Sequence, residues 1–178
     1  LSLAAVMSVI PTPALATIVV NNGQTTDNKI LAGVHYEDPS DDGWMEVHSG
    51  GLATNTTIHS GGWQLLSGGS TIYTTINYLG QQYVYSGGEA TSTTLNSSGE
   101  QYVYSGGSAT LTTINSGGKQ ITSSGGQATG IIQNVGGNTI AAVYGSDTQT
   151  VVSGTNASGG FSLSNGSANG FILYGDKN

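Results

Sequence analysis

The sequence predicts an all-β protein, a right-handed parallel β-helix (β-solenoid) with rungs of about 19 residues. Strand-forming Val, Ile, Thr and Tyr alternate with pairs of glycines, and no helical period appears after Ala16. The tripeptide Ser-Gly-Gly recurs at spacings of 18, 19, 19 and 19 residues, starting at Ser49, Ser67, Ser86, Ser105 and Ser124. A unit this short cannot bury its own apolar residues, so its copies are expected to stack.

The first sixteen residues predict a targeting segment that lies outside the fold. An apolar run over residues 1–10 is followed by two prolines and then by Ala-Leu-Ala, the small-residue pattern that signal peptidase reads. We therefore expect cleavage between Ala16 and Thr17, which makes residues 1–16 the C-terminal part of a signal peptide. No Lys or Arg precedes Lys29, so the sequence is expected to start inside a longer leader or to be a fragment. A buried N-terminal helix or strand is the alternative.

Residues 17–48 predict a degenerate N-terminal rung with an acidic insertion loop. The first half of a unit ends near Leu31, and the second half resumes at Trp44. Pro39, Ser40 and Gly43 favour a solvated loop, although paired carboxylates could also hold Ca²⁺ or act on a glycosidic bond. The titratable residues of this cluster are His35, Glu37, Asp38, Asp41, Asp42 and Glu46, with His48 nearby.

Residues 49–142 predict the regular repeats, and residues 143–178 predict degenerate rungs that continue toward a missing C-terminal region. In a parallel stack, residues at one repeat position line up about 4.8 Å apart. The predicted inward columns are Ala53, Ala90, Ala109 and Ala128; Ile58, Ile76, Leu95 and Ile114; and Leu66, Val84 and Val103.

Polar columns run through the same repeats. Side-chain amides at equivalent positions can form hydrogen-bonded ladders. The columns with this chemistry are Asn77, Asn96, Asn115 and Asn134, and Gln64, Gln82, Gln101 and Gln120. Tyr83 and Tyr102, with the neighbouring Tyr85 and Tyr104, are expected to stack.

The composition excludes several functional classes. Only 7% of the residues are charged, the net charge is −7, and there is no cysteine. Three lysines without arginine cannot build a basic face, which argues against nucleic-acid binding. The absence of cysteine removes disulfides and thiolate metal sites, and no GxSxG or HExxH motif is present. We therefore predict a structural or binding module that is not an enzyme and uses no cofactor or metal.

The ideal unit, SGGxATxTTINSGGxQYVY, resembles the imperfect 19-residue repeat of AIDA-type self-associating autotransporter adhesins of Gram-negative bacteria. The resemblance covers residues 49–140 closely and residues 21–178 in degenerate form. It implies the N-terminal part of a passenger domain that is exported through the periplasm to the cell surface or secreted. Complete members continue into a membrane β-barrel, and no such pattern precedes Asn178, so membrane attachment is expected only through a region absent from this chain.

The resemblance also implies a function. Such passengers adhere to host-cell receptors and self-associate, which gives autoaggregation and biofilm formation. Some members carry O-linked heptose on Ser and Thr, added by a dedicated heptosyltransferase. The candidate acceptors are the serines at the expected corners, Ser49, Ser60, Ser67, Ser86, Ser105, Ser116 and Ser124.

Two alternative functions remain. Some β-helices are polysaccharide-active enzymes, for which the acidic loop would be the site. Regular threonine arrays resemble those of ice-binding solenoids, and four Thr-Thr pairs recur here, beginning at Thr56, Thr74, Thr93 and Thr112. Adjacent residues of a strand point to opposite faces, so only one threonine of each pair is expected outside.

Overall fold

The computed structural model describes residues 17–32, 43–123 and 125–134, and beyond these the backbone of further strands up to residue 174. Within this part the chain forms three parallel sheets of eight strands each. Sheet A contains β1 (Thr17–Val20), β4 (Trp44–His48), β7 (Trp63–Ser67), β10 (Gln81–Val84), β13 (Glu100–Val103), β16 (Lys119–Thr122), β19 (Asn138–Ala142) and β22 (Gly160–Ser164).

Sheets B and C are built from shorter strands. Sheet B contains β2 (Thr25–Asp27), β5 (Leu52–Thr54), β8 (Ser70–Ile72), β11 (Glu89–Thr91), β14 (Ser108–Thr110), β17 (Gln127–Thr129), β20 (Ser146–Thr148) and β23 (Ser167–Asn169). Sheet C contains β3 (Ile30–Leu31), β6 (Thr57–Ile58), β9 (Thr75–Ile76), β12 (Thr94–Leu95), β15 (Thr113–Ile114), β18 (Ile132–Gln133), β21 (Val151–Ser153) and β24 (Ile172–Tyr174).

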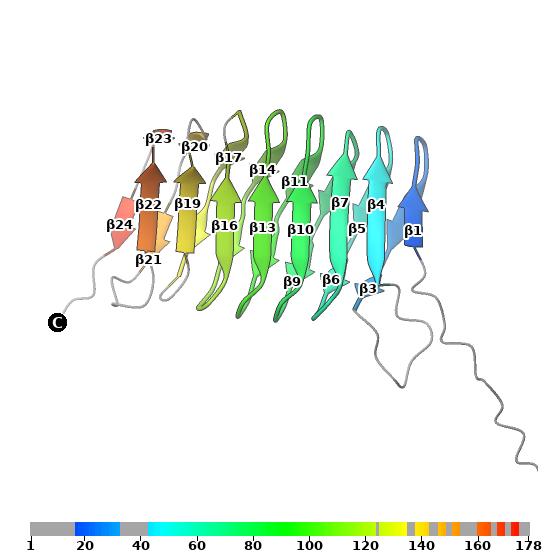
Figure 1. Cartoon of the computed structure of the whole chain (residues 1–178), viewed down its shortest axis with the longest axis horizontal. Helices are drawn as coiled ribbons and strands as arrows, with labels where there is room; N and C mark the ends of the chain where they lie inside the picture. Colours follow the sequence, from blue (N-terminus) through cyan, green and yellow to red (C-terminus); the bar gives the residue numbers. More distant parts are fainter. Residues whose placement is uncertain are drawn as a thin grey trace, which may run out of the picture.

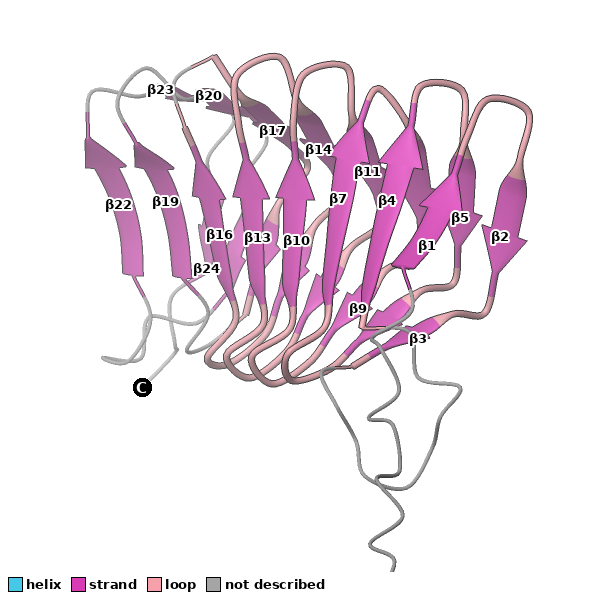
Figure 2. Ribbon diagram, turned by 45° about the vertical axis from the view of Figure 1, so that its right-hand side comes forward, coloured by secondary structure: helices cyan, strands magenta, loops and turns pink. Residues whose placement is uncertain are grey.

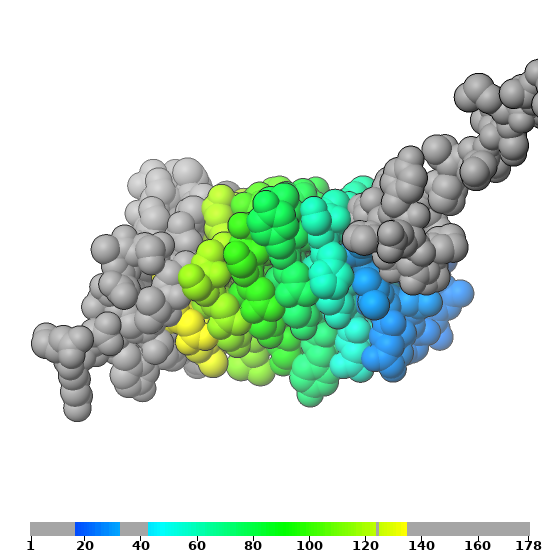
Figure 3. Space-filling model, turned by 90° about the horizontal axis from the view of Figure 1, so that it is seen from below, coloured from blue at the N-terminus to red at the C-terminus, as the bar shows by residue number. Residues whose placement is uncertain are grey.

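One turn of the chain contributes one strand to each sheet. In Figure 1 the strands of sheet A run upward in front, the chain returns behind through sheet B, and it comes forward along the bottom through sheet C. The coils advance from right to left, which makes the solenoid right-handed, as predicted. Figure 2 shows the three sheets as the walls of one tube, and Figure 3 shows successive coils as adjoining bands of colour across the lower surface.

We number the coils and their corners for reference. Coil 2 is residues 44–62, coil 3 is 63–80, coil 4 is 81–99, coil 5 is 100–118, and the described part of coil 6 ends at residue 134. Corner 1 joins sheet A to sheet B, corner 2 joins B to C, and corner 3 joins C to the sheet A strand of the following coil. Neighbouring coils pair in register, for example Tyr83 with Tyr102 and Val84 with Val103.

Each rung has three strands, one in each sheet. In coil 4, β11 ends at Thr91 and β12 begins at Thr94, and the chain bends between them at corner 2, where Ser92 has a left-handed φ of 57°. The same conformation occurs in the equivalent residues Asn28, Asn55, Tyr73, Leu111 and Gly130. No pair of glycines marks this corner, so the sequence pattern did not reveal it.

The core consists of the predicted columns. The alanine, Ile/Leu and Leu/Val columns are all buried, with exposed fractions of 0 to 2%. The first threonine of each pair, at Thr56, Thr74, Thr93 and Thr112, also points inward. The interior is therefore filled by small and branched side chains that stack on their equivalents in neighbouring coils.

Both predicted amide ladders are present. In the buried ladder, Nε2 of Gln82, Gln101 and Gln120 donates to Oε1 of the glutamine one coil earlier, at 2.7 to 2.8 Å. In the half-buried ladder next to corner 3, Nδ2 of Asn96, Asn115 and Asn134 donates to Oδ1 of the preceding asparagine at 2.7 to 2.9 Å. The two ladders satisfy polar groups that would otherwise be costly to bury.

Candidate functional site

Corner 1 exposes one serine in most coils. Ser49, Ser86 and Ser105 are exposed, and each precedes a glycine with a φ of 71° to 74°. The second glycine of each pair is required by close packing, because a Cβ on Gly107 would lie 2.4 Å from the carbonyl oxygen of Val84. The glycine pair therefore forms a tight corner that holds the serine hydroxyl at the surface.

Corner 3 carries a second set of exposed serines. Ser60 and Ser116 lie there, as predicted from the second Ser-Gly-Gly of the unit. Ser97 occupies the same place in coil 4 and is also exposed, but its unit reads Asn-Ser-Ser-Gly, so a search for Ser-Gly-Gly missed it. Alignment by the preceding asparagine would have found this residue.

Ser67 differs from the other candidate serines. Coil 3 is one residue shorter, and Ser67 is the last residue of β7, in register with His48, instead of standing at corner 1. Its side chain is exposed on the outer face of sheet A. The 18-residue spacing in the sequence results from this deletion. Ser124 and Ala16 lie outside the described residues, and Thr17 is the exposed first residue of β1.

The outer face of sheet A carries a cluster of aromatic side chains. Tyr83 stacks on Tyr102 with ring centroids 5.2 Å apart and planes at 10°, and Tyr85 stacks on Tyr104 at 4.8 Å and 9°. The predicted tyrosine stacking is therefore confirmed. On the N-terminal side, the rings of Trp63 and Tyr83 are perpendicular, with centroids 6.3 Å apart.

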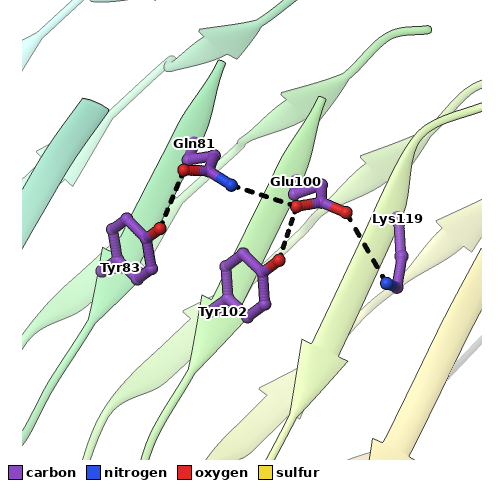
Figure 4. Close-up of polar contacts among 5 residues, drawn as sticks. All are labelled: Gln81, Tyr83, Glu100, Tyr102 and Lys119. Carbon is purple, nitrogen blue, oxygen red and sulfur yellow. Dashed lines mark hydrogen bonds and ion pairs between the residues drawn. The ribbon is translucent and has the colours of Figure 1, made fainter. Parts of the chain in front are cut away.

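A polar network borders the tyrosines (Figure 4). Gln81 accepts a hydrogen bond from Tyr83 at 2.8 Å and donates one to Glu100 at 3.2 Å. Glu100 also accepts a hydrogen bond from Tyr102 and lies 3.6 Å from Nζ of Lys119. These five side chains come from β10, β13 and β16 and link three coils across the surface.

Within this network the pKa values of Glu100 and Tyr102 shift in opposite directions. Burial acts to raise the pKa of Glu100, but the hydrogen bonds from Tyr102 and Gln81 and the charge of Lys119 outweigh it, so that this pKa is lowered. Burial, followed by the hydrogen bond to the Glu100 carboxylate, raises the pKa of Tyr102. Glu100 is therefore held as a carboxylate and Tyr102 as a neutral donor at physiological pH.

A shallow groove opens where the tyrosine stack stops. It has a volume of about 380 Å³ and is lined by Trp63, Leu65, Gln81, Tyr83 and Tyr85. Leu65 is in register with Tyr83, so a leucine and not a tyrosine precedes it in the column. The sequence did not point to this groove, because it arises where Leu65 of coil 3 is smaller than Tyr83, the residue in register with it in coil 4.

Threonines form columns on the other two outer faces. The second threonine of each pair, at Thr57, Thr75, Thr94 and Thr113, is partly exposed on sheet C, as predicted. A further column, Thr54, Thr91, Thr110 and Thr129, lies on sheet B and was not anticipated. Corner 2 separates the two columns, so each is one residue wide.

The acidic cluster is only partly described. His35, Glu37, Asp38, Asp41 and Asp42 lie outside the described residues. Glu46 and His48 project from β4, with Nε2 of His48 3.1 Å from Oε2 of Glu46. Over residues 17–32, 43–123 and 125–134, no three His, Asp or Glu side chains gather as a metal site. No helix in the described structure is long and apolar enough to cross a membrane.

Comparison with known proteins identifies the family. Residues 74–137 match the family described as adhesin of bacterial autotransporter system, probable stalk. The chain is also similar to the crystal structure of a TibA fragment hyper-glycosylated by TibC, with 35% sequence identity and a TM-score of 0.67. That match covers 87% of this chain and 67% of the fragment. No curated protein sequence matches the chain. The repeat, the solenoid and this likeness together show that the chain belongs to the AIDA-type family of autotransporter adhesin passengers.

Proposed function

We propose that this chain is part of a surface-exposed passenger that mediates adhesion, autoaggregation and biofilm formation, and that its corner serines are acceptors for O-linked heptose. Family membership supports export to the cell surface and a structural, non-enzymatic passenger. The observation that carries the glycosylation proposal is the regular exposure of serine hydroxyls at corners 1 and 3. The similar TibA fragment was hyper-glycosylated by TibC, so a related heptosyltransferase is the proposed partner.

Adhesion by this rod would depend on repetition. The outer faces present columns of threonine, serine and tyrosine, so that a contact made by one coil can be repeated by the next. Linked weak contacts raise the overall affinity through effective concentration, without any single strong site. Only 7% of the residues are charged, which leaves few charges on the columns to oppose the approach of a second rod.

Intact mass and peptide mapping test the glycosylation proposal. The chain is expressed with and without an autotransporter heptosyltransferase, and heptose-sized increments are expected on peptides that contain Ser86, Ser105 and Ser116. Ser105→Ala should remove one increment, whereas Ser108→Ala should remove none, because Ser108 is half-buried within β14. An unmodified mass, or increments found only on other peptides, would overturn the assignment of the acceptors.

Settling of cells that display the passenger tests self-association. Replacing Thr94 alone by valine should slow settling little, whereas replacing Thr75, Thr94 and Thr113 together should slow it strongly, because repeated contacts are lost at once. Urea unfolding of the single and the triple variant, compared with the wild type, controls for folding. A single outer substitution that abolished aggregation would contradict a repetitive mechanism.

A further inference from the structure

The tyrosine ladder ends abruptly between coil 4 and coil 3. The rings of Tyr83 and Tyr85 are nearly parallel to those of Tyr102 and Tyr104 at separations close to the strand spacing, so they stack along the axis of the rod. On the other side, the outward position equivalent to Tyr85 is Ser67, because β7 is in register with β4 and coil 3 is one residue shorter. The face of Tyr85 toward coil 3 therefore has no ring against it, and this side chain is 38% exposed.

The groove under this face combines aromatic walls with unused hydrogen-bonding groups. Its walls are Tyr83 and Tyr85 on one side and Trp63 and Leu65 on the other. Gln81 uses one amide hydrogen for Glu100 and one lone pair for Tyr83, so one donor and one acceptor remain. The Tyr85 hydroxyl makes no hydrogen bond to the described residues, which leaves it both a donor and an acceptor. The volume of about 380 Å³ lies in the range of small-ligand sites.

We propose that this groove binds one neutral pyranose ring of a glycan on the surface to which the rod adheres. A pyranose has an apolar face of C–H groups that can stack on Tyr85 as the missing rung of the ladder. Its hydroxyl groups each donate and accept a hydrogen bond, which matches the free groups of Gln81 and Tyr85. The proposal rests on the adhesive function proposed above and gives it a ligand class.

Other ring-shaped ligands fit the groove less well. No cationic side chain is among the described residues that line the groove, and the Glu100 carboxylate lies beside Gln81, so an anionic nucleotide would find no counter-charge there. An aromatic side chain of a second copy would stack equally well, but it would cover Gln81 without replacing its hydrogen bonds, and burying unpaired polar groups is unfavourable. The walls and the polar groups together therefore favour a neutral sugar.

Nuclear magnetic resonance titration of the full chain tests the proposal. The chain has two tryptophans, so the indole N–H signals of Trp63 and Trp44 serve as reporters and are assigned with Trp44→Phe. The probes are the methyl pyranosides of glucose, galactose and mannose, and N-acetyltyrosinamide as an aromatic competitor. Chain produced without a heptosyltransferase is used, so that the result is independent of serine modification.

At least one sugar should shift the Trp63 signal with a saturable, millimolar dissociation constant. Ser67→Tyr, which would supply the missing ring, and Tyr85→Ala should each weaken binding about tenfold. The matched variant Tyr104→Ala removes a ring of the same ladder that does not line the groove, and it should bind within about twofold of the wild type. Thermal unfolding of each variant confirms that it folds.

Three results would overturn the assignment. No response to any of the sugars would remove the site. Equal binding by Ser67→Tyr, Tyr85→Ala and the wild type would place the sugar elsewhere. A response to N-acetyltyrosinamide alone would assign the groove to an aromatic side chain. Cells that aggregate normally while the groove variants lose sugar binding would leave the adhesive function intact and limit the site to glycan recognition.

Discussion

Replacing Gln101 by leucine should destabilise the solenoid strongly, although the volume of the side chain changes little. Gln101 is fully buried at the centre of the glutamine ladder. It donates to Gln82 at 2.7 Å and to Thr93 at 3.2 Å, and it accepts from Gln120 at 2.8 Å and from Thr112 at 3.1 Å. Leucine removes all four bonds and opens no cavity, so the loss of these hydrogen bonds dominates the expected effect.

The magnitude follows from the partners that remain. Oε1 of Gln82 keeps only a contact with Thr93 at 3.4 Å, and Nε2 of Gln120 keeps only Thr112 at 3.3 Å. Each buried polar group left without a good partner costs about 1–3 kcal/mol. Two such groups give an expected loss of about 2–6 kcal/mol in the free energy of unfolding.

Urea unfolding followed by far-ultraviolet circular dichroism measures this loss. The matched control is Asn115→Ala in the asparagine ladder, which also loses a bond on each side. Asn115 is only half-buried, so water replaces its partners and the loss should be about 0.5–1.5 kcal/mol. A Gln101→Leu chain as stable as the wild type would refute the reasoning. Changing Gln64, Gln82, Gln101 and Gln120 together to leucine should cost less than the sum of single changes, since no glutamine is then left without its neighbour in the ladder and only the buried hydroxyls of threonines such as Thr93 and Thr112 lose partners.

Three further predictions concern the outer network and the corners. The lowered pKa of Glu100 means that its carboxylate stabilises the fold above its unfolded pKa and that this contribution is lost as the pH falls through the folded pKa. Lowering the pH from about 5 to 3 should therefore reduce the thermal unfolding temperature of the wild type more than that of Glu100→Gln. An equal fall in the two unfolding temperatures would contradict this. Leu111 has a φ of 59° and is 53% exposed, so Leu111→Asn should raise the free energy of unfolding by about 1 kcal/mol; an unchanged urea midpoint would exclude such strain. Gly107→Ala should cost about 3 kcal/mol, because its Cβ would meet the Val84 carbonyl oxygen, whereas Gly23→Ala, with no atom within 4 Å of its Cβ, should cost clearly less in the same assay.

The interior of this solenoid was largely predictable from the sequence. A parallel stack places equal repeat positions above one another, so columns such as Ala90 and Ala109 or Gln82 and Gln101 follow from the period alone. The inward direction of Thr93 and the outward direction of Thr94 follow from the alternation of strand residues. Period and alternation together are sufficient wherever the repeat is regular.

The irregular features were not predictable in this way. Corner 2 is formed by residues as different as Ser92 and Leu111, whose left-handed conformation is imposed by the pairing of coils on both sides and not by their own preference. The shifted place of Ser67 depends on where a one-residue deletion is absorbed, which the spacing alone does not specify. The groove beside Trp63 combines that deletion with Leu65, which is in register with Tyr83, so it became visible only in three dimensions.

The amide ladders give the rod a direction. In both of them coils 4, 5 and 6 each donate a side-chain N–H to the amide oxygen of the coil before. The C-terminal end of a folded stack therefore presents one amide oxygen from each ladder as a hydrogen-bond acceptor. The next coil can donate to both oxygens only when it docks in one orientation and one register. Such an end acts as a template, so each folded coil selects the conformation of the coil that follows it. Two rods cannot join through these ladders by ends of the same kind, because both ends would present acceptors or both would present donors.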